Sequence, residues 1–343
     1  MEFGKTTANN FLGGNVAGNY SNAAFSISAS SAVSEKLSVS SLLHWEQNGV
    51  DHKIEFSYAF ATWRLSKSFD LRVGKVKHPG NLYSEVFDVG TLRPFLSLPQ
   101  TIYGGACLAF DHYTGLGLNG KVFAGAWELG ISAYGGGGAC PYQSARTALG
   151  AALSGKPAAT STSARNMLGG RMTIRPPITG LTLGVTAQRA VAEPVGTPAL
   201  DATQIGGQLE YLTDKLWLRA ELAHTNTKTQ SAQGGAAVFR STGYYVEAAY
   251  FLVPSWQIAA QAGRLKDKIF EAQPLPADLD YHREIAIGLN RWLTTNMVFK
   301  ASYHWVRGNR LAYPNPADLL AAFSTGQLQP RTRLFELGGQ FSF

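Results

Sequence analysis

Apolar and polar residues alternate with a period of two along most of the chain, and the last ten residues show this most clearly. Phe335, Leu337 and Phe341 occupy one parity there, whereas Glu336 and Gln340 occupy the other. Successive side chains of a β-strand point to opposite faces, so the pattern predicts a strand with one apolar and one polar face.

Similar segments recur along the sequence, and each is about long enough to cross a bilayer when tilted. The predicted strands cover residues 23–33, 37–47, 53–64, 69–76, 105–118, 122–134, 166–176, 180–189, 203–213, 215–226, 240–251, 256–266, 281–292, 297–307 and 332–343. A chain that starts and ends on the same side of a membrane needs an even number of strands. We therefore expect one more strand, short or clipped, within residues 1–10. The first residues lack the basic and apolar regions of a signal peptide, so we expect a mature or truncated chain.

The connections between these strands alternate between short and long. The predicted short ones are residues 34–36, 66–68, 119–121, 177–179, 213–214, 253–255 and 294–296, and the long ones lie near 48–52, 77–104, 135–165, 190–202, 227–239, 267–280 and 308–331. Outer-membrane barrels have short periplasmic turns and longer outer loops, whereas a soluble sandwich has no reason to sort its loops by side.

The alternation also predicts which way each side chain points. In residues 53–64, Ile54, Phe56, Tyr58 and Phe60 are expected to face out, and the residues between them, Ser57 included, to face in. Each Arg or Lys on the lipid face at mid-bilayer costs about 2–4 kcal/mol, so the charged parity must face an aqueous interior.

Composition supports a membrane barrel over a soluble domain. Of the 343 residues, 45% are hydrophobic and only 15% are charged, against about 25% charged in typical soluble domains. No run of about 18 apolar residues predicts a transmembrane helix. The formal net charge is +7, but Lys and Arg are scattered, so no nucleic-acid partner is expected.

These observations predict one domain over residues 1–343: an all-β, transmembrane, antiparallel up-and-down β-barrel of about 16 strands in the bacterial outer membrane. Such a barrel contacts membrane lipids and lipopolysaccharide. Sixteen strands leave an open lumen, whereas eight do not.

The motifs of catalysis and cofactor binding are weak in this chain. Gly115, Gly117 and Gly120 match G-x-G-x-x-G, but an alternating strand follows them where a dinucleotide site needs a helix. The seven histidines show no metal-ligand spacing. We expect no catalytic, cofactor-binding or metal site and no enzyme. A hydrolase built from a Ser and a His that meet only in space stays open as an alternative.

The two cysteines, Cys107 and Cys140, match no metal motif. Both are expected near the outer side of the barrel, in an oxidising compartment, where they are candidates for a disulfide. Two isolated thiols are the alternative.

Residues 77–104 form a long connection, rich in proline and aromatic residues, that is too apolar to extend freely into water. A loop of this length usually has a function. Folding into the lumen would bury its apolar side and narrow the pore.

At this segment the sequence resembles the Gram-negative outer-membrane porins, a family of 16-stranded trimeric barrels that includes anion- and phosphate-selective members. Residues 71–79, 88–90, 93–94 and 99–103 resemble their strand and constriction loop, and residues 288–303 are similar to their penultimate hairpin. The terminal Phe343 resembles their assembly signal. Related loops often carry an Arg-Pro-Pro run where Ser97, Leu98 and Pro99 stand here.

The resemblance implies a homotrimer with an inward-folded third loop that passes small hydrophilic solutes by passive diffusion. The mixed signs of the expected pore-lining residues favour anions only weakly. These residues are Arg72, Lys75, Lys77, Arg93, Arg171, Arg175, Arg219, Glu221 and Lys300. A structural barrel that sheathes or anchors a partner protein is the main alternative.

Overall fold

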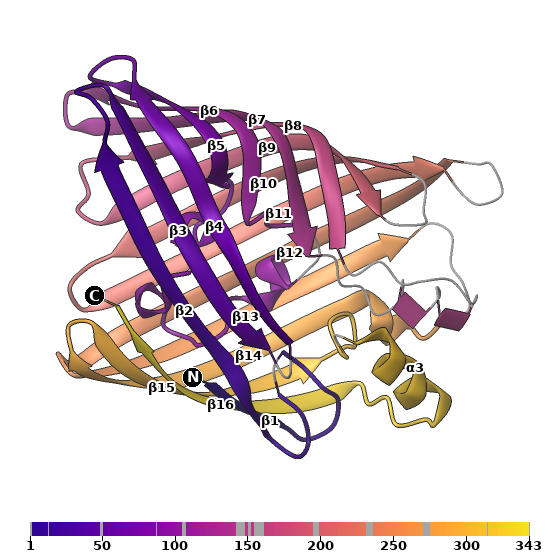
Figure 1. The fold of residues 1–343 in the computed structure, drawn as a ribbon. Helices are drawn as coiled ribbons and strands as arrows, with labels where there is room; N and C mark the ends of the chain where they lie inside the picture. The colour runs from indigo at the N-terminus through magenta and orange to yellow at the C-terminus, as the bar shows by residue number, and fades with distance from the viewer. Residues whose placement is uncertain are drawn as a thin grey trace.

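The computed structural model describes residues 2–12, 14–48, 51–86, 88–104, 108–141, 148–149, 152–153, 161–194, 199–230, 236–269, 275–313 and 315–342. Sixteen antiparallel strands in these ranges form one closed barrel, in which each strand pairs with its neighbours along the chain and β1 pairs with β16 (Figure 1). The expected all-β, up-and-down barrel with a short first strand is therefore confirmed.

The strands are β1 (Glu2–Thr6), β2 (Asn19–Ala32), β3 (Leu37–Asn48), β4 (Asp51–Arg64), β5 (Phe69–Lys77), β6 (His112–Ala124), β7 (Trp127–Pro141), β8 (Ser161–Arg175), β9 (Leu181–Pro194), β10 (Leu200–Leu212), β11 (Leu216–Gln230), β12 (Ala236–Val253), β13 (Trp256–Ile269), β14 (Tyr281–Thr294), β15 (Met297–Arg307) and β16 (Arg331–Phe341). The helices are η1 (Ser84–Val86), η2 (Gly90–Leu92), α1 (Gln100–Tyr103), η3 (Ala277–Asp280) and α3 (Pro316–Ser324). None of the described helices is both long and apolar enough to pass through a bilayer.

Short turns gather at one end of the barrel and long connections at the other (Figure 1). The connection expected to be long near residues 48–52 is an exception, because β3 and β4 leave only residues 49–50 between them, outside the described residues. By the loop rule for outer-membrane barrels, the end with the long connections is the outer end.

Side chains are sorted inside-out compared with a soluble protein. Large apolar residues such as Leu222, Phe299 and Leu337 are about half exposed on the outer face of the barrel wall. Their sequence neighbours Glu221 and Lys300 point inward and are buried. The facing expected from the period of two holds in β11, β15 and β16, because one apolar face and one polar face are what a lipid-embedded pore wall requires.

The facing expected for the second half of β4 is wrong, and a β-bulge is the reason. Leu42 of β3 pairs with Tyr58, but Leu43 pairs with Phe56, so Ser57 is an extra residue. One inserted residue reverses the parity of everything that follows. Phe60 accordingly packs against buried residues of the interior instead of facing lipid.

The hairpin between β6 and β7 also lies further along the chain than the sequence indicated. Residues 119–121 were expected to form the turn, but β6 runs through them to Ala124, and the turn is at residues 125–126. Gly125 has φ +60, a conformation that glycine adopts without steric cost. The candidate dinucleotide motif at Gly115, Gly117 and Gly120 therefore lies inside one strand.

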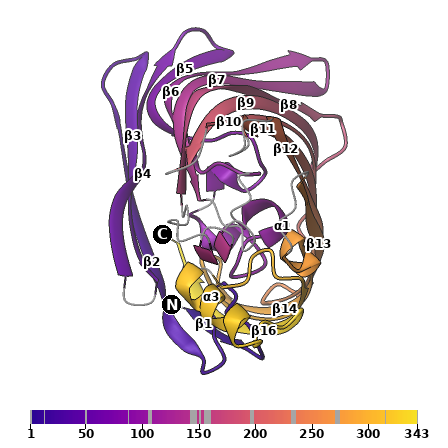
Figure 2. The same cartoon turned by 90° about the vertical axis from the view of Figure 1, so that its right-hand side faces the viewer.

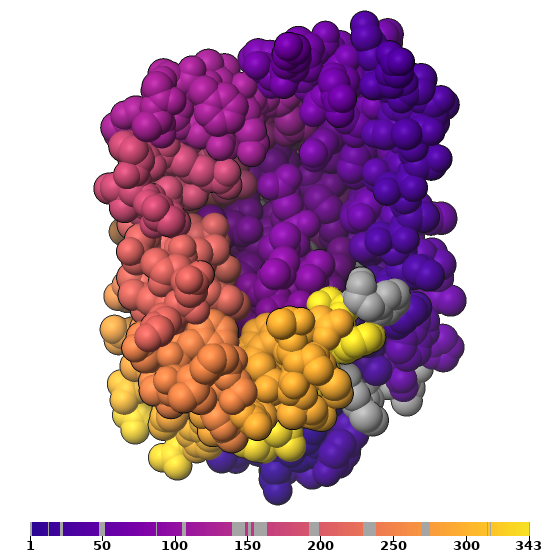
Figure 3. Space-filling view, turned by 90° about the vertical axis from the view of Figure 1, so that its left-hand side faces the viewer, coloured from indigo at the N-terminus to yellow at the C-terminus, as the bar shows by residue number. Residues whose placement is uncertain are grey.

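Between β5 and β6, the described residues of the range 78–111, here called the inner segment, fold into the barrel. Figure 2 shows α1 inside the ring of strands, and Figure 3 shows purple atoms of this region within the hollow seen from the short-turn end. Apolar residues of the segment pack against inward-facing apolar residues of the opposite wall, namely Tyr83, Leu98, Ile102 and Leu108 against Ala223, Tyr245, Leu265, Val306 and Leu334. The expectation of an inward third loop is confirmed.

Because the outer face meets lipid and the inner face meets water, an arginine substitution should lower the free energy of unfolding much more on the outer face than on the inner face. Ile287 is 51% exposed on the outer face at the middle of β14, so Ile287→Arg is expected to lower the free energy of unfolding by about 2–4 kcal/mol. Ser28→Arg, on the inward face of β2, is the matched control and is expected to change it by less than about 0.5 kcal/mol. Urea titration of each variant in vesicles measures both, and equal losses would contradict the assigned facing.

Candidate constriction site

The inner segment crosses the lumen and rests on the wall formed by β11, β12 and β13. Two glycines permit this approach: a Cβ added at Gly243 would lie 2.1 Å from the Thr101 carbonyl oxygen, and one at Gly263 would lie 2.8 Å from Thr101 Oγ1. The Thr101 hydroxyl donates a hydrogen bond to the Tyr244 carbonyl at 3.0 Å. Helix α1 is therefore in direct contact with the strand backbone.

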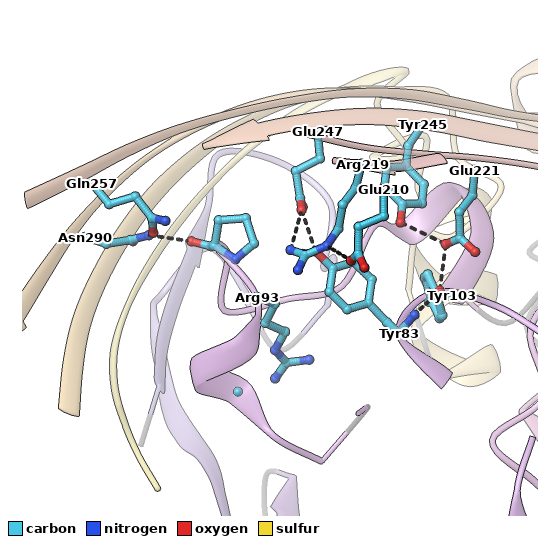
Figure 4. Close-up of polar contacts among 12 residues, drawn as sticks. Tyr83, Arg93, Tyr103, Glu210, Arg219, Glu221, Tyr245, Glu247, Gln257 and Asn290 are labelled. Carbon is cyan, nitrogen blue, oxygen red and sulfur yellow. Dashed lines mark hydrogen bonds and ion pairs between the residues drawn. The ribbon is translucent and has the colours of Figure 1, made fainter. Parts of the chain in front are cut away.

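Glu221, on the inward face of β11, accepts three hydrogen bonds around the inner segment, and Figure 4 shows the two from Tyr103 and Tyr245. The Leu82 backbone N–H donates to Oε1 at 2.8 Å, and the Tyr103 and Tyr245 hydroxyls donate to Oε2 at 2.7 and 2.8 Å. The carboxylate is 3% exposed, so the segment shields it from the lumen. Hydrogen bonds to a charged group are stronger than neutral ones, which makes Glu221 a principal anchor of the segment.

A second anchor is built around Arg219 of the same strand. Its Nε donates to Glu210 at 2.8 Å, and its Nη1 donates to the Tyr83 hydroxyl at 3.0 Å and lies 3.7 Å from Glu247. The Tyr83 hydroxyl donates to Glu247. Burial and the Glu247 carboxylate raise the pKa of Tyr83 well above its usual value, so the phenol keeps the proton that it donates.

Lys300 and Asn290 hold the middle of the inner segment against β14–β16. Lys300 Nζ donates to the carbonyls of Gly90 and Arg93 at 2.9 and 2.5 Å, and Asn290 Nδ2 donates to the Pro94 carbonyl at 2.9 Å. Lys300 is 1% exposed. Lys300, like Arg219 and Glu221, points inward as expected, but the segment covers it.

The two ends of the inner segment are tied together at Lys77. Its ammonium lies 2.8 Å from the Asp88 carboxylate and 2.5 Å from that of Asp111. The next residue, His78, contacts Tyr134 and Gln188 at 2.7 and 2.8 Å. Burial lowers the pKa of His78 to about 4, so the ring is neutral at ordinary pH.

Two arginines of the wall, Arg72 of β5 and Arg171 of β8, face one glutamate of the inner segment. Arg72 Nη1 lies 4.0 Å and Arg171 Nη1 3.6 Å from the Glu85 carboxylate. These distances exceed a hydrogen bond, and the Glu85 side chain is 45% exposed. The side chains of Arg72 and Arg171 are 31% and 14% exposed, so this group is more open to the lumen than the covered anchors.

The remaining residues expected in the pore lie in separate places. Arg175 pairs with Glu128 at 3.0 Å near the short-turn end and is half exposed. Lys75 contacts Glu55 at 3.8 Å and the Phe56 carbonyl at 2.5 Å. Figure 4 shows the Arg93 side chain directed away from the group around Arg219.

The open part of the lumen lies beside β2, whose inward-facing residues Ser26, Ser28 and Ser30 are small and polar. Ser28 and Ser30 are exposed although they face the interior. Inward residues of the opposite wall, such as Gln257 and Asn290, are fully buried under the inner segment. Exposure thus divides the interior into a covered wall and an open one.

A Ser–His–Glu chain of hydrogen bonds also lies in the barrel. Ser302 Oγ is 2.8 Å from His304 Nε2, and His304 Nδ1 is 2.6 Å from Glu284. A nucleophile must reach its substrate, but Ser302 and His304 are 4% and 1% exposed. Ser97 of the inner segment donates to Glu336 of the same cluster at 3.0 Å, so this network positions the segment.

Several site residues were missed by sequence reasoning, above all Glu85, Glu210, Glu247 and Tyr83. Glu247 directly follows the outward-facing Val246 in β12, so the alternation of the strand could have placed Glu247 in the lumen. Nothing in the sequence says which wall the inner segment touches. The disulfide expected between Cys107 and Cys140 stays a prediction, because Cys107 and the side chain of Cys140 lie outside the described residues.

No protein-family model matches the sequence, and no curated protein matches it. The fold is similar to the anion-selective porin of Comamonas acidovorans, which is 13% identical with a TM-score of 0.57 over 100% of this chain and 99% of that one. It is also similar to the outer-membrane channel DcaP of Acinetobacter baumannii, 9% identical with a TM-score of 0.59 over 100% and 94%. The trimer form of the outer-membrane protein OmpT of Vibrio cholerae is 8% identical, with a TM-score of 0.60 over 100% and 97%. The chain therefore has the barrel fold of Gram-negative outer-membrane porins.

Proposed function

We propose that this protein is an outer-membrane porin through which small hydrophilic solutes diffuse passively, and that residues 77–104 form its constriction. The observation that carries the proposal is the pairing of an open, small-residue polar wall with an inner segment anchored to the opposite wall. A polar bore narrowed at one level selects solutes by width and by charge.

The charges at the narrowing favour anions weakly. Arg72 and Arg171 provide two positive charges against the one carboxylate of Glu85. A unit charge about 6 Å from an ion in water contributes about 0.7 kcal/mol, so one excess positive charge supports a modest preference and no more.

The reversal potential of the purified protein in a planar bilayer with a KCl gradient tests both parts of the proposal. We expect ohmic conductance steps and a reversal potential displaced toward the chloride potential. Conductance steps with a clear cation preference would contradict the proposed anion preference but would still support channel formation. Absence of any conductance from correctly folded protein would instead favour a barrel that sheathes or anchors another protein.

We propose further that the protein assembles as a homotrimer in the outer membrane. The family resemblance of the sequence and the trimer form of a protein with this fold support the proposal. Mass photometry in detergent measures the assembly directly, and a monomer at all concentrations would contradict it.

A further inference from the structure

Four arginines that are far apart in the sequence form one row across the outer face of the barrel. Arg264 of β13 is the register partner of Arg283 of β14, Arg283 is the partner of Arg307 of β15, and Arg307 is the partner of Arg331 of β16. These strands lie side by side (Figure 1). With strands about 4.8 Å apart, the four guanidinium groups occupy about 15 Å of the wall. We call them the arginine row.

The row faces away from the lumen. Ile285 and Trp305, two positions further down β14 and β15, are 57% and 41% exposed on the outer face. Arg283, Arg307 and Arg331 share their parity and are exposed as well. Within the described part of the chain, no carboxylate forms an ion pair with any of the four.

Like charges directly opposite each other on neighbouring strands destabilise a sheet. Three such pairs in succession indicate that a negatively charged group from outside the chain compensates them. A contrast on the same face supports this reading: Arg189 of β9 is held by Asp201 of β10 at 2.7 Å, so this surface does use carboxylates elsewhere.

A basic hollow adjoins the row. It has a volume of about 580 Å³, and Arg264 lines it together with Arg240, Lys266, Lys268, His224 and Tyr244. These residues have the outward parity of β11–β13, since Leu222 and Val246 on the same faces are half exposed. The hollow and the row therefore form one continuous basic surface.

The height of this surface on the barrel identifies the environment that it meets. Arg307 ends β15 and Arg331 begins β16, at the end with the long connections. Arg307 is two residues beyond Trp305, about 7 Å along the strand, and Trp and Tyr mark the membrane interface. The row thus lies at the headgroup level of the outer leaflet, where an arginine costs little.

We propose that the arginine row and the adjoining hollow bind the phosphate groups of lipopolysaccharide, the phosphorylated glycolipid of the outer leaflet. Guanidinium groups bind phosphate oxygens in pairs of parallel hydrogen bonds, and several phosphates on one headgroup match a row of several arginines. The proposal rests on the outer-membrane placement of the barrel and does not depend on its conductance.

Binding of lipid A in mixed detergent micelles, followed by thermophoresis of the labelled barrel, tests the site. Wild type is expected to bind bisphosphorylated lipid A at least about tenfold tighter than enzymatically dephosphorylated lipid A. R283Q/R307Q is expected to lose this difference. R189Q/K228Q removes two outward-facing charges near Asp201 on the same rim and is expected to stay within about twofold of wild type.

Retention of the preference for phosphorylated lipid A by R283Q/R307Q would overturn the proposal. Equal binding of inorganic pyrophosphate, lost in the same variant, would identify a soluble phosphate ligand instead and would also overturn it. Far-UV circular dichroism and channel conductance of the variant check that the barrel is folded.

The urea concentration at which the barrel unfolds provides a second test, because the effect of R283Q/R307Q on it should have opposite signs in membranes without and with lipid A. In phosphatidylcholine vesicles R283Q/R307Q is expected to unfold at the same or a higher urea concentration, because like-charge repulsion falls. In vesicles that contain lipid A it is expected to unfold at a lower concentration than wild type. A change of the same sign in both membranes would contradict the proposed site.

Discussion

Glu221→Ala is expected to release the inner segment from the β11–β12 wall and to enlarge the pore. The substitution leaves the Leu82 N–H and the Tyr103 and Tyr245 hydroxyls without their acceptor. Each buried donor left unsatisfied costs about 1–3 kcal/mol, so docking of the segment weakens by about 3 kcal/mol or more. The undocked population then rises about a hundredfold.

Single-channel recording measures this effect as larger and noisier conductance steps, and liposome swelling measures it as a higher size limit for neutral sugars. Glu128→Ala is the matched control, because Glu128 also points into the barrel but pairs with Arg175 and Lys121, away from the inner segment. An unchanged size limit in Glu221→Ala, with the barrel folded, would show that this anchor does not set the width of the pore.

Replacement of both arginines at the narrowing is expected to reverse the ion preference. In R72Q/R171Q the Glu85 carboxylate stays as the one charge of this group. Loss of two positive charges at about 6 Å raises the energy of a passing anion by about 1.4 kcal/mol and lowers that of a cation by the same amount, so the ratio of anion to cation permeability should fall by up to about a hundredfold at low salt. The reversal potential in a KCl gradient reports this ratio.

Glu85→Gln supplies the opposite test at the same place, since it should raise anion preference while width is unchanged. R175Q is the control for loss of a lumen charge elsewhere, because Arg175 lies near the short-turn end beside Glu128. The assignment of the narrowing fails if R175Q shifts the reversal potential more than R72Q/R171Q does. Salt of about 1 M should shrink both effects, because the Debye length there is about 3 Å.

The sequence was sufficient to predict the wall of the barrel because the physical constraint on each strand is local. Lipid on one side and water on the other force a period of two, and that period assigns Phe299 outward and Lys300 inward without knowledge of any neighbour. The turn between β6 and β7 lies at residues 125–126 instead of 119–121, but Phe123 and Trp127 on either side of it are both exposed on the outer face.

Features that depend on contacts between distant residues could not be predicted in this way. The extra residue at Ser57 reversed the parity of Tyr58 and Phe60, and no local signal marks it. The wall to which the inner segment docks depends on Gly243 and Gly263, which are indistinguishable from other glycines in the sequence. The arginine row was hidden because its members lie about 20 residues apart and meet only through strand register.

Thiol accessibility in a planar bilayer tests most directly whether the inward faces line a water-filled bore. In a C107S/C140S background, Ser28→Cys on the inward face of β2 should react with a charged methanethiosulfonate added from water, and the current should fall in discrete steps. Ile27→Cys, its outward neighbour, 52% exposed to the lipid side, should leave the current unchanged. Reaction and block at position 27 with none at position 28 would contradict the account.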